Sequence, residues 1–85
     1  MKELFKNYEA AQKRTDEIEK RLDLDPESEE LNEAWDKAYS EEYKAWEALI
    51  NEIVRITKGA INRDTAKAMV ATKRAELKSL VERIA

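Results

Sequence analysis

The sequence contains neither cysteine nor histidine. Without cysteine the chain has no disulfide framework and no thiolate site. Without histidine it lacks the commonest general base and a principal zinc ligand. Ser40 and Ser79 therefore have no histidine to activate them, and carboxylates paired on one helix surface do not form a cleft. We predict a protein that is not an enzyme and that has no catalytic residue, metal site or cofactor.

Glycine and proline are almost absent, with one of each in 85 residues. Charged residues make up 41% of the chain and hydrophobic residues 42%, a composition typical of helices joined by short loops. A β fold needs more turn residues. The length suits one small core, so we predict a single all-α domain over residues 1–85.

Long apolar runs are missing as well. No stretch approaches the roughly 20 residues that span a bilayer. The charged start "MKELFKNYEAAQKR" lacks the apolar centre of a signal peptide. We expect no membrane association and a cytoplasmic protein.

The few helix-breaking residues predict the helix boundaries. Asp25 is a candidate N-cap with Pro26 at the first helical position, where a missing N–H costs nothing. Gly59 suits the left-handed residue that ends a helix, and Asn62 is a candidate N-cap for the next helix. The predicted helices cover residues 2–23, 26–58 and 63–84.

Apolar spacing predicts how these helices pack. In 2–23 the apolar stripe advances in steps of four and three residues, typical of a seam facing one partner helix. In 26–58 the apolar residues spread over about 200° of the helical wheel, more than one neighbour can cover. Helix 63–84 again has one apolar face, on which Lys73 is expected to meet a carboxylate from Glu42 or Glu47. We predict a three-helix antiparallel bundle with a long central helix.

Charge is distributed unevenly along the chain. Residues 1–54 contain eight Lys and Arg against sixteen Asp and Glu, a net charge of −8, whereas residues 55–85 contain eight against three, a net charge of +5. A basic stripe lies beside the apolar face of helix 63–84, within about 60° on the helical wheel. It consists of Arg63, Lys67, Arg74 and Lys78. This stripe either balances carboxylates of the neighbouring helix or contacts a phosphate backbone.

A helix-turn-helix with "KGAIN" as its turn is disfavoured, because the preceding helix is about four turns too long.

The acidic segment "DLDPESEELNEAWD" has three interpretations. As a calcium loop it fails, because Ser28 and Ala34 occupy the positions of the required glycine and bidentate glutamate. Its carboxylates either form a solvated helix start or dock on a basic partner, imitating a phosphate backbone. The candidate contacts are Glu29, Glu30 and Glu33.

Aromatic residues mark one edge of helix 26–58. Tyrosine and tryptophan are enriched in protein interfaces, and here they stand beside Glu42 and Glu47. The candidate partner-binding residues of this edge are Tyr39, Tyr43, Trp46 and Ile50. They either fill the core of the bundle or bind a partner or a second copy of the chain, and solvent accessibility decides between these alternatives.

The closing segment "ITKGAINRDTAKAMVATKRAELKSLVERIA", together with the small size and high charge, resembles small uncharacterised all-helical proteins of bacterial phages and mobile elements. The resemblance covers about a third of the chain and carries no functional motif. It implies binding to a larger host protein, such as a defence nuclease, in the cytoplasm of a bacterial host cell. We therefore expect a protein-interaction module, such as a phage-type inhibitor or adaptor. The alternative is a nucleic-acid-binding module that uses the basic stripe.

Overall fold

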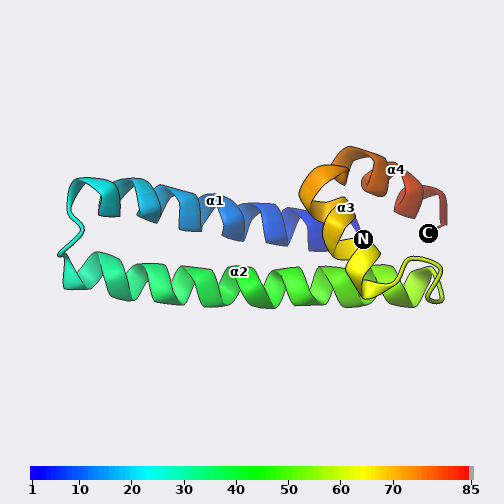
Figure 1. The fold of residues 1–85 in the computed structure, drawn as a ribbon, viewed down its shortest axis with the longest axis horizontal. Helices are drawn as coiled ribbons and strands as arrows, with labels where there is room; N and C mark the ends of the chain where they lie inside the picture. Colours follow the sequence, from blue (N-terminus) through cyan, green and yellow to red (C-terminus); the bar gives the residue numbers. More distant parts are fainter. Residues whose placement is uncertain (85) are drawn as a thin grey trace. The chain divides into compact units, whose positions relative to one another are not determined.

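The computed structural model describes residues 1–84, and these residues form four α-helices and no strand (Figure 1). The helices are α1 (Lys2–Leu24), α2 (Glu29–Ile56), α3 (Arg63–Thr72) and α4 (Arg74–Ile84). The prediction of an all-α fold is confirmed. The prediction of three helices is wrong, because the segment expected as one helix over 63–84 is divided into α3 and α4.

The chain divides into two compact units, and α2 contributes to both. We call Lys2–Trp46 the hairpin unit, and Glu47–Ala85 together with Met1 the C-terminal unit. That residues 1–85 make a single domain stays a prediction.

The hairpin unit consists of α1 and the first part of α2, which lie side by side (Figure 1). Two polar contacts show the relative direction of the two helices. Trp35 Nε1 donates to Glu19 Oε1 at 3.0 Å, and Arg14 Nη1 donates to Glu41 Oε2 at 2.7 Å. Residues later in α2 therefore meet residues earlier in α1, so the pair is antiparallel. The predicted seam of α1 is present in part. Its members Tyr8, Ala11 and Thr15 are buried, whereas Leu4, Ile18 and Leu22 are half-buried, and Phe5, which was not assigned to the seam, is buried as well.

The turn between α1 and α2 differs from the sequence prediction. Ser28 N donates to Asp25 O at 3.3 Å, so Pro26 occupies the second position of a four-residue turn, which its fixed φ favours. The N-cap of α2 is Ser28, whose Oγ accepts from Leu31 N at 3.2 Å. The predicted cap at Asp25 is wrong because a proline-containing turn precedes the helix. Asn32 secures this turn by donating Nδ2–H to Pro26 O and Ser28 O.

The C-terminal unit contains the end of α2 followed by α3 and α4. Each of these helices contributes residues that are almost completely removed from solvent, and burial of such side chains stabilises a fold by roughly 1.5–3 kcal/mol each. These buried helical residues are Leu49, Ile50, Ile53, Ala66, Val70, Leu77 and Val81, and Ile61, in the segment between α2 and α3, is buried as well.

The last turn of α2 closes in a Schellman motif. Gly59 N donates to Val54 O at 3.0 Å, and Lys58 N donates to Arg55 O at 3.2 Å. The left-handed position that follows the helix cap is Lys58, with φ 53°, and Gly59 comes next with φ 82°. The sequence prediction placed Gly59 in the first of these positions. Two successive residues with positive φ are needed to turn the chain, and glycine supplies only the second.

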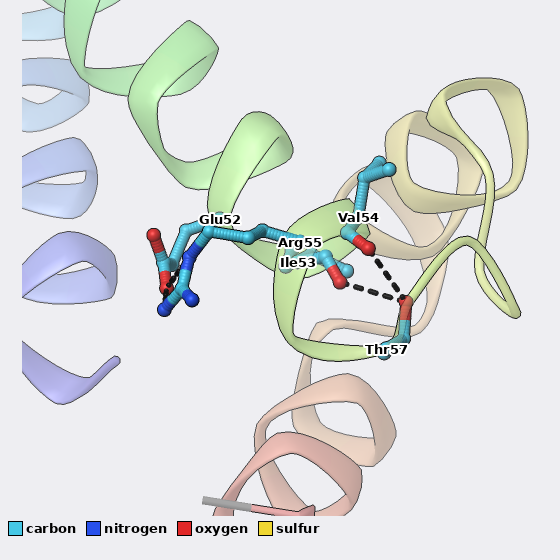
Figure 2. A network of polar contacts seen from close by, with 5 residues as sticks. All are labelled: Glu52, Ile53, Val54, Arg55 and Thr57. Carbon is cyan, nitrogen blue, oxygen red and sulfur yellow. Dashed lines mark hydrogen bonds and ion pairs between the residues drawn. The ribbon is translucent and has the colours of Figure 1, made fainter.

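The hydroxyl of Thr57 joins the end of α2 to the segment that leads into α3. Figure 2 shows its contacts with Ile53 and Val54. Its Oγ1 lies 2.8 Å from Ile53 O and 3.3 Å from Val54 O, and it accepts from Ile61 N at 3.2 Å. Ile61 is buried, so its N–H needs a partner within the protein. The hydroxyl therefore holds together the turn that reverses the chain.

On another side of the same helical turn, Arg55 donates Nε–H to Glu52 Oε1 at 2.9 Å (Figure 2). This hydrogen bond holds the pKa of Glu52 below its ordinary value and raises that of Arg55. Because the pKa of Glu52 is lowered on folding, any stabilisation is present above its unfolded pKa and is lost as the pH falls through the folded pKa.

Asn62 caps α3 as predicted, with its side chain accepting from Thr65 N at 2.8 Å. The helix then ends at Lys73, whose φ of −134° and ψ of 42° leave the helical region. Arg74 restarts the helix and donates its side-chain Nε–H to Val70 O at 3.1 Å. No glycine or proline marks this break. The predicted buried position of Lys73 on one long helix is wrong, because Lys73 is the exposed cap between two helices.

Replacing Lys58 with glycine should stabilise the protein. A non-glycine residue in the left-handed region carries a conformational penalty of about 1 kcal/mol. This penalty is somewhat larger than the free-energy cost of the extra backbone entropy that glycine loses on folding. We expect K58G to raise the free energy of unfolding by about 0.5 kcal/mol in a urea titration. The matched control K37G places glycine at an exposed interior position of α2 and should lower the same quantity by about 1 kcal/mol. A lower free energy of unfolding for K58G would contradict the conclusion that Lys58 occupies a left-handed position that glycine favours.

Replacing Thr57 with valine should destabilise the protein by about 1–2 kcal/mol, since Ile61 N–H loses its acceptor while the side-chain volume is kept. T57S retains the hydroxyl and should recover most of the loss. The control is T72V, because exposed Thr72 donates only to Ala68 O within its own helix, and its free energy of unfolding should stay within about 0.5 kcal/mol of the parent. Equal effects of T57V and T72V in thermal or urea unfolding would refute this interpretation.

Candidate binding surface

Two tyrosines on α2 are largely open to solvent. Tyr39 is 47% exposed and Tyr43 is 52% exposed, whereas Trp46 is half-buried. Ile50, predicted to belong to the same edge, is completely buried and belongs to the C-terminal unit. The predicted aromatic edge is therefore a surface at Tyr39 and Tyr43, whereas Ile50, one turn beyond Trp46, is a core residue.

These aromatic residues line a shallow hollow of about 210 Å³ within the hairpin unit. Four of its residues come from α2 at the spacing i, i+3, i+4 and i+7, which places them on one face of the helix. The fifth comes from α1. The lining residues are Tyr8, Tyr39, Glu42, Tyr43 and Trp46, and we call this group the aromatic hollow.

The rings of α2 contact one another in two pairs. Trp35 stacks on Tyr39 with ring centroids 5.0 Å apart and an interplanar angle of 13°. Tyr43 lies against Trp46 at 5.9 Å with an angle of 37°. The hydrogen bond from Trp35 to Glu19 fixes the first pair against α1. Such contacts orient the rings before any partner arrives, which reduces the entropy lost on binding.

Tyr8 was not predicted to belong to this surface. Its place in the seam of α1 indicated a core residue, and the ring is indeed buried, with 7% of its surface exposed. It also lines the hollow. A tyrosine in a seam carries a hydroxyl that must reach water or a polar partner, so a seam tyrosine is the sequence signal that marks such an edge.

The hairpin unit is strongly acidic. Its residues include eight Lys and Arg against fourteen Asp and Glu, a net charge of −6. The predicted acidic contacts Glu29, Glu30 and Glu33 are exposed on the first turns of α2, but they do not line the hollow. Within residues 1–84, no three acidic side chains converge as they would around a metal ion, and no helix is long and apolar enough to cross a bilayer.

The predicted basic stripe does not lie on one helix. The break at Lys73 puts Arg63 and Lys67 on α3, and Arg74 and Lys78 on α4. The prediction that all four side chains lie on one continuous helix is wrong, and a helical wheel no longer predicts their alignment.

Arg63 of this set is engaged within the C-terminal unit. Its Nη2 lies 3.0 Å and 3.2 Å from the two carboxylate oxygens of Glu47, and its Nη1 donates to Asn51 Oδ1. These contacts join the first turn of α3 to α2. The arginine thus connects two helices of the fold, in agreement with the charge-balance interpretation at this position.

Comparison with known proteins found no matching family model, no matching curated protein and no matching solved structure.

The pair between Arg63 and Glu47 should contribute a small, salt-sensitive stabilisation, because both side chains are partly exposed. A double-mutant cycle with R63Q, E47Q and the double variant should give a coupling energy of about 0.2–1 kcal/mol at low ionic strength. Urea unfolding at two salt concentrations measures it. No coupling at low salt, or coupling that grows with salt, would show that Arg63 does not stabilise the fold electrostatically.

Proposed function

We propose that this protein is a non-enzymatic protein-interaction module that binds a larger protein through the aromatic hollow. The observation that carries the proposal is the exposure of Tyr39 and Tyr43 beside half-buried Trp46 on one face of α2. A small domain has few large side chains with which to fill a core. Tyr39 and Tyr43 nevertheless remain about half exposed, and neighbouring rings hold them in place. They supply the rigid apolar area that interfaces use.

The charge around the hollow supports a basic partner. The hairpin unit has a net charge of −6, and the exposed carboxylates Glu29, Glu30 and Glu33 lie on the same helix as the tyrosines. An acidic rim speeds association with a basic surface and disfavours acidic partners. The resemblance of the C-terminal third to phage-encoded proteins suggests a host protein, for example a defence nuclease, in the bacterial cytoplasm. An acidic inhibitor or adaptor of this kind would occupy a basic surface of its target.

The alternative function, nucleic-acid binding through the basic residues of α3 and α4, has less support. Arg63 is paired with Glu47, and the four cations are divided between two helices. Tight duplex binding that weakens with salt and is abolished by R74E would favour this alternative over protein binding.

The proposal is tested by Y43A. We expect Y43A to weaken capture of the partner, or self-association if the partner is a second copy, by about tenfold or more, as for a central aromatic contact. Pull-down from a bacterial lysate with quantitative mass spectrometry, together with sedimentation velocity, measures both. Helix content by circular dichroism should remain unchanged, because the Tyr43 side chain is half exposed.

The matched control is L24A, which removes a hydrophobic side chain that is 89% exposed and lies outside the hollow. L24A should capture the same proteins as the parent. Equal capture by parent, Y43A and L24A, with no change in self-association, would contradict the proposed function.

A further inference from the structure

We infer that the aromatic hollow binds the guanidinium group of an arginine side chain on the partner protein. This inference rests on the proposed function and specifies the chemistry of its partner. It follows from three features of the hollow: partly exposed aromatic rings, a half-buried carboxylate in the same lining, and an acidic surround.

The aromatic faces provide the first feature. Tyr39 and Tyr43 are about half exposed, and Trp46 lies against Tyr43 at 5.9 Å. A cation positioned over the face of a tyrosine or tryptophan is attracted by the negative charge of the ring face, and more strongly where water is partly excluded. A hollow lined by several such rings is suited to a cation as well as to an apolar group.

The carboxylate of Glu42 selects a cation over an apolar group. Glu42 is half-buried in the lining, between Tyr39 and Tyr43 in the helix sequence. None of the ion pairs that join described residues involves Glu42. A half-buried carboxylate that meets an apolar side chain loses water without gaining a partner, which is unfavourable. A guanidinium restores those hydrogen bonds.

Arginine fits this combination better than lysine. Its planar guanidinium can stack on a ring face and still direct two parallel N–H groups at one carboxylate, whereas an ammonium is a compact and strongly hydrated charge. The net charge of −6 on the hairpin unit favours the approach of a cation over that of an anion. The occupant we assign is therefore an arginine on a basic surface of the partner.

The experiment uses blocked arginine, N-acetyl-arginine amide, as the probe and the full chain as the receptor. Titration followed by the indole N–H signals of the two tryptophans in a ¹⁵N spectrum should show saturable shifts at Trp46, in the millimolar range expected for one side chain. Blocked citrulline has the same shape without the charge, and it should give no saturable shift. Blocked lysine should bind more weakly than arginine.

Two substitutions locate the site. E42Q should weaken arginine binding by about tenfold, because a charged hydrogen-bonded pair is lost. E33Q removes the same charge from an exposed position of α2 outside the hollow and should change binding less than twofold. Should E42Q reduce helix content, Y39L provides a second test, since it keeps apolar bulk but removes an aromatic face and should also weaken binding.

Equal shifts with arginine and citrulline, or equal effects of E42Q and E33Q, would overturn the inference. The two proposals fail separately. If arginine does not bind but Y43A still abolishes capture of the partner, the arginine site is wrong and the protein-binding function stands. If arginine binds through Glu42 while Y43A captures the same proteins as the parent, the site stands and the proposed function fails.

Discussion

The hydroxyl of Thr57 makes hydrogen bonds on both sides of the turn that ends α2, and the C-terminal unit depends on this turn. Together with the backbone hydrogen bonds of the Schellman motif, this hydroxyl fixes the path of the chain from Ile56 to Asn62, the cap from which α3 begins. Ser28 has a corresponding position in the hairpin unit, where its hydroxyl accepts a hydrogen bond from the backbone N–H of Leu31 in the first turn of α2. A chain with one glycine and one proline thus relies on side-chain oxygens at helix ends to define its turns.

Much of the fold was predictable because it follows from spacing and composition. The scarcity of turn residues indicated an all-α fold, the predicted seam of α1 includes three of its four buried residues, and Asn62 was identified as a cap from its residue type. The break at Lys73 was not predictable. Neither glycine nor proline lies near it, and the segment has helical spacing on both sides. Val70 and Leu77, on the two sides of the break, are both buried, and helical spacing alone would place them on one face of an unbroken helix. The spacing of apolar residues therefore does not show that the helix is interrupted between them.

The candidate site was predictable in part for a related reason. Tyr39, Tyr43 and Trp46 share a helix face, so their proximity follows from α-helical geometry alone. Two facts required the structure. Tyr8 joins them from another helix, and Ile50, one turn beyond Trp46, is buried. Periodicity shows which residues share a helix face. It does not show which residues along that face are buried, because burial depends on where the neighbouring helices end.

The break between α3 and α4 has a consequence for protease sensitivity. Proteases bind backbone that leaves helical geometry, and regular helices resist cleavage for that reason. Most lysines and arginines of this chain lie within helices. Lys58 and Lys73 are exposed and non-helical, and Lys73 is followed directly by Arg74. A trypsin-like enzyme therefore finds a cleavable bond at this position, and a single cut there separates α4, with buried Leu77 and Val81, from the rest of the chain. Limited proteolysis therefore detects the boundary between α3 and α4, which sequence periodicity does not reveal.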